Sequence, residues 1–525
     1  MTIPLLLPLA ATAFQLHLGA QCIQTDVSSI DSLTFDAARQ QLIVHRAESA
    51  VFGVPISSID SISFPQLQSH ASIRFSHDLV SSVNPYYFDG LTIECSGNNV
   101  KVVSRCNFVT DFEIEGQASD ASIVIEADQP IRLHLNGLTL YSSRQSIIRL
   151  AKASAATILI EGENTLIHTA SEEDCDSPEA AIFATGQLTL SGSGALSIQT
   201  DGKVGHSLHA SALSIEGGSF AIDNSSRGIK GDGIIYSPIA ILTDETFEMS
   251  RGRLSIHASR EAGKGIVCQG PITIGSGQDS SLELDIHCTG KTLYTPGPDG
   301  HTLTEGCPAI LTPHSITIQG GDISIETADN ASQGIKADER IDISGGRLFM
   351  QCYDDCLNSA GPITFAGGTT VCYSTGDDAI DSDYAQSGAI VIDGGNLFAY
   401  TTQGPSEEAL DCDDNRRILL RSGIVVTFGG AQHPEQRSLG SNLQPYYLGP
   451  ALEDCRSGCY YSLTDPQGTP ICTFRFDHDF QSTQSLLSSP GFDPACWSIT
   501  ESPEPPAHFS ESVAGRFFIG DYTRL

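Results

Sequence analysis

The chain has 525 residues, 40% of them hydrophobic, and carries a formal net charge of −35 at pH 7. This length supplies enough apolar side chains for one long core or two ordinary ones. The negative charge repels polyanions, so we exclude nucleic acid as a partner and expect neutral ligands, metal ions, or anionic ligands held through metal ions.

The first predicted element is a signal peptide over residues 1–20. Its apolar run, residues 3–14 (IPLLLPLAATAF), is too short to span a bilayer, and Gly19 and Ala20 offer small side chains for cleavage before Gln21. Cys22 follows directly and is a candidate for a lipid anchor. We therefore expect a secreted or bacterial cell-surface protein without a transmembrane segment, and an outer-membrane lipoprotein if Cys22 is lipidated.

The next predicted element is an N-terminal β module over residues 21–108. Two near copies, VSSIDSLTF (27–35) and ISSIDSISF (56–64), lie within it. Repeated β-type runs with alternating polarity predict paired strands. We interpret the module as a spacer ahead of the main domain.

Residues 109–428 carry an internal repeat. Glycine pairs follow short β-type runs in IQGGDISI (318–325), ISGGRLFM (343–350), FAGGTTVC (365–372) and IDGGNLFA (392–399). A second column, in phase with the first, reads GIK (334–336), CLN (356–358), AID (379–381) and ALD (409–411). Two columns at one period predict stacked coils, in which neighbouring coils bury the Ile and Leu side chains. We therefore predict an all-β fold, a right-handed parallel β-helix of about ten coils with a small β module at each end.

The repeat extends toward the N-terminus with wider spacing. The predicted inner apolar column continues through Ile182, Leu208, Ile229, Ile266 and Ile310. We expect the segment TPGPDGH (295–301) to leave the stack as a loop. Because no stretch keeps apolar residues at helical spacing for three turns, we expect no long helix.

The last predicted element is a small C-terminal β domain over residues 429–525. Its segment GCYYSLTDPQGTPICTFRF (458–476) is typical of a hairpin, with PQG as the turn. The chain has 15 cysteines, and four of them crowd this region: Cys455, Cys459, Cys472 and Cys496. Small domains gain stability from cross-links in an oxidising compartment, so disulfides are an expectation here.

Acidic turns recur within the repeat, most densely in GDDAIDSD (376–383). Equivalent turns of stacked coils lie roughly 5 Å apart, so acidic side chains at the same position would converge. Carboxylates this close repel one another, and Ca²⁺ takes about six to eight oxygen ligands. We therefore predict a calcium centre. Its candidate ligands are Asp354, Asp355, Asn358, Asp377, Asp378, Asp381, Asp383, Glu407, Glu408, Asp411 and Asp413.

Several segments together resemble a bacterial family of carbohydrate-binding β-helix domains of unknown function. They are VTDFEIEGQASDASIVIEADQPIRLHLNGLTL (109–140), ATILIEGENTL (156–166), the repeat columns, and FRFDHDFQSTQSLLSSP (474–490). A clostridial member of that family binds calcium and adheres to cellulose and pectic acid. The resemblance implies that the GDDGI-type turn holds calcium through Asp377, Asp378, Asp381 and Asp383.

Three side chains beside the acidic turns are candidate carbohydrate contacts: Tyr353, Tyr373 and Lys336. Tyrosine rings can stack on sugars, although a buried aromatic ladder explains the two tyrosines at least as well. The single Trp, Trp497, does not predict a flat platform for crystalline cellulose. We therefore favour an acidic, pectin-like polysaccharide held through calcium over cellulose.

Two enzymatic alternatives stay open. Paired carboxylates hydrolyse glycosides, but the GHG turn and RIK run of pectin hydrolases do not occur in the chain. A polysaccharide lyase would use calcium to neutralise a uronate carboxylate and Lys336 to take the proton, although a salt bridge with Asp338 explains Lys336 more simply. A structural or adhesive surface protein with structural calcium is the remaining alternative. We expect a monomeric, non-catalytic protein that binds polysaccharide.

Overall fold

The computed structural model describes residues 12–46, 49–77, 79–170, 180–202, 205–227, 229–231, 234–277, 281–296, 301–404, 406–412, 417–431, 439–440, 442–506 and 511–519. The chain divides into two compact units, Met1–Val204 with Leu208–Phe220, and Gly205–Ser207 with Ala221–Leu525. The described residues contain strands and three short 3-10 helices but no α-helix, which confirms the all-β prediction. Within these residues, no helix has the length and apolarity needed to cross a membrane.

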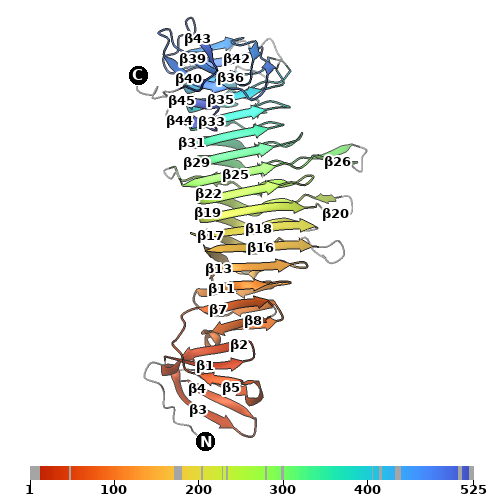
Figure 1. Ribbon diagram of the computed structural model, residues 1–525, viewed down its shortest axis with the longest axis vertical. Coiled ribbons are helices and arrows are strands. Elements are labelled where there is room, and N and C mark those ends of the chain that lie inside the picture. Colours follow the sequence, from red (N-terminus) through yellow and green to blue (C-terminus); the bar gives the residue numbers. More distant parts are fainter. Residues whose placement is uncertain are drawn as a thin grey trace. The chain divides into compact units, whose positions relative to one another are not determined.

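The first unit opens with antiparallel strands. They are β1 (Ala13–Leu18), β2 (Gln21–Asp26), β3 (Ile30–Asp36), β4 (Gln41–Arg46), β5 (Ser49–Pro55) and β6 (Ser61–Ser63) (Figure 1). β1 pairs with β2 and β6, whereas β3, β4 and β5 form a separate sheet. Each near copy folds as a 3-10 turn, η1 (Val27–Ser29) or η2 (Ile56–Ser58), followed by a strand. The two copies therefore share local structure but join different sheets.

Strand β1 lies within the predicted signal peptide. Phe14 and Leu16 are buried in the core of the antiparallel module, so cleavage after Ala20 would remove two core side chains. Cys22 is buried in β2, where desolvation raises the pKa of its thiol to about 11. Residues 1–11 lie outside the described residues, and secretion and lipidation stay predictions.

A ladder of parallel strands follows in the same unit. Its strands are β7 (Ala71–His77), β10 (Asn99–Ser104), β11 (Thr110–Ala118), β12 (Ser122–Ala127), β13 (Ile131–Ser142), β14 (Ile148–Lys152), β15 (Ala155–Glu161), β16 (Glu163–Ala170), β17 (Ile182–Gly192) and β18 (Ala195–Gly202). β8 (Leu79–Asn84) and β9 (Leu91–Ser96) pair antiparallel with β7 and β10, so the large sheet is mixed. Parallel pairing begins before the predicted boundary at residue 109, because β2 pairs parallel with β8, β7 with β11 and β10 with β12.

A buried histidine of this ladder predicts a pH effect on stability. His168 in β16 lies in register between Ser142 and Thr200 and is 1% exposed. Desolvation lowers its pKa from 6.5 to about 4. The folded state therefore binds fewer protons than the unfolded state between these values, so its contribution is present above pH 6.5 and is lost as the pH falls toward 4.

We expect acidification across this window to cost up to about 3 kcal/mol of the free energy of unfolding through His168. The variant His168→Gln cannot take up this proton. The difference in melting temperature between wild type and His168→Gln should therefore change as the pH is lowered from neutral. A difference that stays constant across the window would contradict this assignment.

The second unit contains the longest run of parallel strands. They are β22 (Ile239–Ala258), β23 (Lys264–Cys268), β24 (Ile272–Ile274), β25 (Leu282–Cys288), β28 (Ile310–Thr312), β29 (Ser315–Thr327), β30 (Ile335–Ala337), β31 (Arg340–Cys352), β32 (Leu357–Ser359), β33 (Ile363–Ser374), β34 (Ile380–Ser382), β35 (Ile390–Thr401) and β36 (Ile418–Phe428). Figure 1 shows β29, β31, β33 and β35 lying side by side in this order. Each long strand and the short strand after it align with their counterparts one repeat later.

The predicted inner column is largely correct in this unit. Its buried members align in register as Ile266, Ile310, Ile335, Leu357 and Ile380. The prediction for Ile229 was wrong, because residues Ile229–Gly231 form β20, which pairs with β21 (Ile234–Tyr236) in a hairpin. Ile241 occupies the register position next to Ile266. The loop expected at 295–301 is a second hairpin, β26 (Leu293–Pro296) with β27 (Thr302–Glu305); residues 297–300 lie outside the described residues.

The two glycines of each repeated pair serve different purposes. At Gly345, a Cβ atom would lie 2.4 Å from the carbonyl oxygen of Gln319 in the preceding repeat, so a side chain is excluded by close backbone approach. Gly346 has a φ of 90°, which residues with a Cβ atom rarely adopt. Gly367 with Gly368 and Gly394 with Gly395 meet the same two requirements in β33 and β35, which explains why the glycines recur as pairs.

A small antiparallel sheet completes the second unit. Its strands are β43 (Ser498–Ser502), β39 (Tyr460–Thr464), β40 (Pro470–Arg475), β45 (Phe517–Ile519) and β44 (Glu511–Val513), in spatial order. Beside it, β42 (Ser485–Ser488) pairs antiparallel with β36 and with β37 (Tyr446–Gly449), and β38 (Asp454–Cys455) pairs with β41 (Phe480–Gln481). Aromatic side chains from this region pack against the outer face of β33, β35 and β36 in one core.

The described cysteines form no disulfide. All 14 of them are free thiols, including Cys455, Cys459, Cys472 and Cys496, so the expected cross-links of the C-terminal region are not found. Eleven of these thiols are buried together with apolar side chains or inside the ladder, as is typical of small hydrophobic residues. The aromatic core is the main packing interaction of the C-terminal region.

Candidate metal centre

The acidic turns connect the end of each long strand to the next short strand. Asp354 and Asp355 lie between β31 and β32, and Asp377 and Asp378 lie between β33 and β34. The next repeat supplies Glu407 and Glu408 after β35. Backbone pairing aligns Asn358 with Asp381 and Asp381 with Asp411 three residues further on. The predicted columns of acidic residues are therefore in register.

Two groups of three carboxylates converge within this alignment. Oxygens of Asp354, Asp355 and Asp377 lie within 4.8 Å of one another, and so do oxygens of Asp377, Asp378 and Glu407. Oxygens bound to one Ca²⁺ at about 2.3–2.6 Å can be no more than about 5.2 Å apart, so both groups fit a single ion each. Asp377 belongs to both groups, which makes it the central residue of the candidate centre.

Most of the converging carboxylates are buried away from solvent. Asp354, Asp355 and Asp378 are each about one-twentieth exposed, while Asp377 is half-buried. Within the described chain, these four aspartates form no salt bridge with Lys, Arg or His. Buried, ionised carboxylates without a cationic partner lower the stability of the folded state, because desolvation and mutual repulsion both oppose ionisation. A bound cation would relieve both effects.

The pKa values of several carboxyl groups in the cluster are raised, because ionisation is unfavourable there. Desolvation, followed by repulsion from Asp354 and other carboxylates, raises the pKa of Asp355 from 3.8 to about 10. Desolvation also raises the pKa of Asp378 to about 9 and that of Asp381 to about 7. The pKa values of Asp377 and Glu407 are raised for the same primary reason. Without a cation, the cluster would hold protons at neutral pH.

Hydrogen bonds fix the orientation of the buried carboxylates. Asp354 accepts from the Ala331 backbone N–H at 2.6 Å and from Gln333 Nε2 at 2.7 Å. Asp378 accepts from the Glu408 backbone N–H. Each carboxylate has a second oxygen or lone pairs left for another contact. The donors therefore orient the carboxylates without satisfying them completely.

The remaining predicted ligands occupy different positions. Asn358 donates through Nδ2 to Asp355 at 2.9 Å and to Asp381 at 2.8 Å, so it bridges two carboxylates. Asp381, Asp411 and Glu408 lie in the aligned columns but outside both groups of converging oxygens. Asp383 is exposed, and Asp413 lies outside the described residues. Their roles as ligands stay predictions.

The two tyrosines predicted as sugar contacts differ in their exposure to solvent. Tyr353 is 41% exposed, and its ring packs against the backbone position of Gly376, the first residue of the acidic octapeptide. Tyr373 is fully buried, which corrects the prediction that it stacks on a sugar. Its ring stacks on Tyr400 with centroids 4.6 Å apart, and its hydroxyl bonds to His478. The reason is the C-terminal aromatic core, which covers the strand face on which Tyr373 lies.

Lys336 lies in register with Asn358, next to the acidic columns. Its positive charge lowers the pKa of Asp381, against the stronger effect of desolvation. None of the ion pairs between described residues joins Lys336 to Asp338, so the predicted structural salt bridge is not found. Lys336 therefore faces the acidic centre as a nearby positive charge.

The sequence did not reveal two supporting residues, Gln333 and Ser374. Gln333 donates to Asp354, and Ser374 accepts from the backbone N–H of Asp377 at 3.1 Å. Gln333 lies one repeat before Asp355, and Ser374 is the last residue of the long strand β33. These positions in the repeat could have indicated both residues. No motif marks either residue by type alone.

The part of the chain that carries two of the acidic turns is similar to a family of known proteins. A model of the family of carbohydrate-binding domain-containing proteins matches residues 96–379. The chain belongs to this family. The matched part of this carbohydrate-binding domain protein includes the turns at Asp354–Asp355 and Asp377–Asp378 and ends before Glu407.

Other comparisons add little. No curated protein matches the chain. A solved structure of a polysaccharide lyase-like protein from C. thermocellum, a gadolinium derivative, is similar at 16% identity over 62% of this chain and 100% of that chain, with a TM-score of 0.32. A likeness this low carries no argument. Family membership is what supports a carbohydrate-related role.

Proposed function

We propose that this carbohydrate-binding domain protein is a non-catalytic polysaccharide-binding protein whose acidic turns hold Ca²⁺. In this proposal the parallel ladder is a right-handed parallel β-helix, and the glycan is acidic and pectin-like. The protein would act as a monomer outside the cell, secreted or held at a bacterial surface. The observation that carries the proposal is the convergence of two carboxylate groups on Asp377.

The donor set favours calcium over other ions. All candidate ligands are oxygen atoms, and the two groups contain no histidine or cysteine. Hard cations such as Ca²⁺ prefer carboxylate and carbonyl oxygens, whereas Zn²⁺ sites usually include nitrogen or sulfur. A partly exposed ion could also accept a uronate carboxylate of the glycan as a further ligand. Calcium would thereby overcome the repulsion between an acidic polymer and a chain of net charge −35.

The first test is retention of the protein on immobilised polygalacturonate. We expect retention in the presence of calcium and its loss when EDTA removes the ion. Retention that is equally strong in EDTA would contradict the role of calcium in glycan binding. Absence of retention under both conditions on every acidic polymer tested would favour a structural surface protein with structural calcium only.

A polysaccharide lyase is the second candidate, because Lys336 lies beside the acidic columns. A lyase would cut the polymer in calcium and produce unsaturated sugar ends that absorb ultraviolet light. We expect neither wild type nor Lys336→Ala to release them. Cleavage by wild type and by the control Lys152→Ala, but not by Lys336→Ala, would establish the enzymatic alternative.

A further inference from the structure

A groove lies on the outer face of the parallel ladder in the second unit. It has a volume of about 370 Å³ and is lined by strands β22, β25, β29, β31 and β44 and by Ala514, which follows β44. This volume falls within the range of typical ligand pockets, about 300–1,000 Å³. The groove is separate from the acidic turns, because its lining residues belong to four long strands, to β44 and to the turn after β44.

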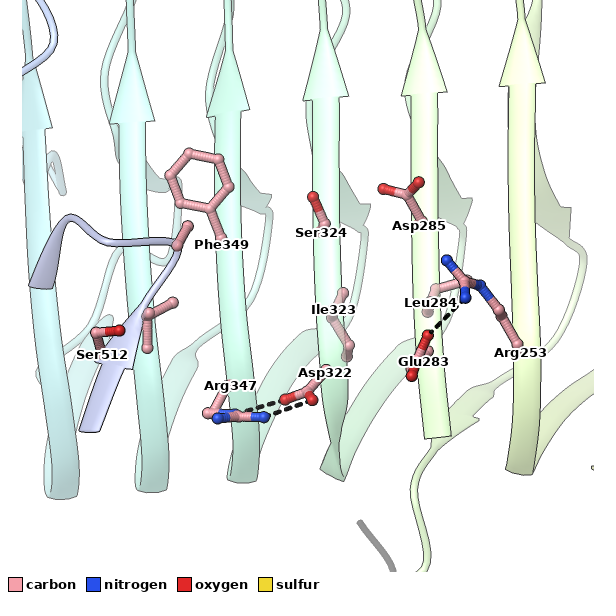
Figure 2. A pocket seen from close by; sticks show the side chains of 12 residues that line it. Arg253, Glu283, Leu284, Asp285, Asp322, Ile323, Ser324, Arg347, Phe349 and Ser512 are labelled. Carbon is pink, nitrogen blue, oxygen red and sulfur yellow. Dashed lines mark hydrogen bonds and ion pairs between the residues drawn. The ribbon is translucent and has the colours of Figure 1, made fainter. Parts of the chain in front are cut away.

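Two rows of side chains form the floor of the groove (Figure 2). The first row aligns Arg253, Glu283, Asp322 and Arg347 on four neighbouring strands. The second row aligns Asp285, Ser324 and Phe349 on three of them. Both rows point away from the buried side of the strands, where Leu284 and Ile323 lie.

Ion pairs orient the charged groups of the first row. Arg347 donates to Asp322 through Nε at 2.6 Å and through a terminal nitrogen at 2.5 Å, and Arg253 lies 3.4 Å from Glu283. These side chains are about half-exposed, and ion pairs at such positions contribute little to stability. The pairing does, however, hold planar donors and acceptors in fixed positions within a groove.

The C-terminal region builds the end wall. Arg516 lies 4.6 Å above the ring of Phe349 and donates at 2.9 Å to the carbonyl oxygen of Ala514. Ala514, which lines the groove, has a φ of 47°, a left-handed conformation that is costly for alanine. Strained residues of this kind cluster at ligand sites, where surrounding contacts hold them in place.

The chemistry of the lining points to a ligand rich in hydroxyl groups. Carboxylates accept hydrogen bonds from hydroxyls, guanidinium groups donate to them, and Ser324 can do both. The ring face of Phe349 is covered by Arg516, so the groove offers hydrogen bonds rather than a stacking platform. Its lining contains three carboxylates, Glu283, Asp285 and Asp322, against two arginines, so an acidic glycan is disfavoured.

We propose that this groove is a second carbohydrate site, which binds an uncharged polysaccharide independently of calcium. Sugar hydroxyls would bond to the paired charged groups of the first row and to Asp285 and Ser324 in the second. The proposal does not rest on the calcium centre, because no residue of the groove belongs to the acidic turns.

The test is affinity electrophoresis in EDTA through gels that contain hydroxyethylcellulose, mixed-linkage β-glucan or galactomannan. We expect at least one of these polymers to retard wild type. Arg347→Ala removes one charged donor, and Ser324→Tyr fills the groove without removing a charge. Each substitution should raise the dissociation constant for the polymer, as obtained from the retardation, about tenfold or more. The control Arg421→Ala breaks a comparably exposed ion pair with Asp393 outside the groove and should change the constant less than about twofold.

Two outcomes would overturn the groove proposal. One is that no uncharged polymer retards wild type in EDTA, and the other is that Arg347→Ala and Ser324→Tyr bind as well as Arg421→Ala. Retention on polygalacturonate in calcium is measured in parallel with the same variants. Because the groove variants should leave that retention unchanged, failure of the groove and failure of the calcium centre can be distinguished.

Discussion

Replacement of Asp377 by asparagine should weaken calcium binding by about tenfold or more, because the carboxylate is a member of both converging groups. The same substitution should not destabilise the calcium-free protein. Desolvation and repulsion from Asp354 and Asp411 raise the pKa of Asp377, so removal of its charge relieves an unfavourable interaction. Calorimetric calcium titration and thermal unfolding in EDTA measure the two effects separately.

A matched control separates this effect from a general loss of negative charge. Asp393→Asn removes an exposed carboxylate that pairs with Arg421 and lies in β35, outside the acidic turns. Its calcium affinity should remain close to that of wild type. If Asp377→Asn and Asp393→Asn bind calcium equally well, Asp377 is not a shared ligand.

Replacement of Phe398 by alanine should lower the free energy of unfolding by about 3–5 kcal/mol, the typical cost of a buried Phe→Ala change. Phe398 in β35 is fully buried in the C-terminal aromatic core. Its ring stacks on Phe517 with centroids 5.4 Å apart and contacts Phe474 at 5.2 Å. It therefore joins the parallel ladder to two strands of the antiparallel sheet.

Urea unfolding, followed by tyrosine and tryptophan fluorescence, measures this loss. Tyr353→Ala provides the control, because it removes an aromatic ring that is 41% exposed and should cost less than about 1 kcal/mol. An equal, small loss for both variants would mean that the aromatic core does not stabilise the C-terminal region.

The periodicity of the sequence predicts the repeated part of the fold well. Paired glycines and Ile or Leu columns reflect constraints that every repeat must satisfy, namely close backbone approach, a positive φ and burial between neighbours. Where a hairpin interrupts the repeat, the pattern fails. Ile229 matched the column by residue type, but the chain places Ile241 beside Ile266 instead.

The candidate site was predictable only as far as the repeat extends. Alignment of Asp355 with Asp378 follows from the period, whereas convergence of particular oxygens depends on turn conformations that spacing does not encode. The burial of Tyr373 depends on a sheet about one hundred residues further along the chain, as its bond to His478 illustrates. The groove residues Arg253 and Arg347 lie on different strands and form no local motif.

The pH dependence of calcium-free protein follows from the raised pKa values of the acidic centre. Asp355 and Asp378 have folded pKa values of about 10 and about 9, against 3.8 as the ordinary value. The folded state therefore binds protons that the unfolded state releases, and this contribution to stability is present below pH 3.8 and is lost as the pH rises through 9 and 10. Calcium should replace these protons, so its stabilising effect should be larger in alkaline than in acidic solution.

The most direct test of the calcium centre is thermal unfolding of chelator-treated wild type at about pH 8, with and without added calcium. Binding to the folded state alone adds about 2.7 kcal/mol at a hundredfold excess over the dissociation constant, so the melting temperature should rise by several degrees. The increase should be smaller for Asp377→Asn. An unchanged melting temperature of wild type across a full calcium titration would contradict the central claim that the acidic turns hold calcium.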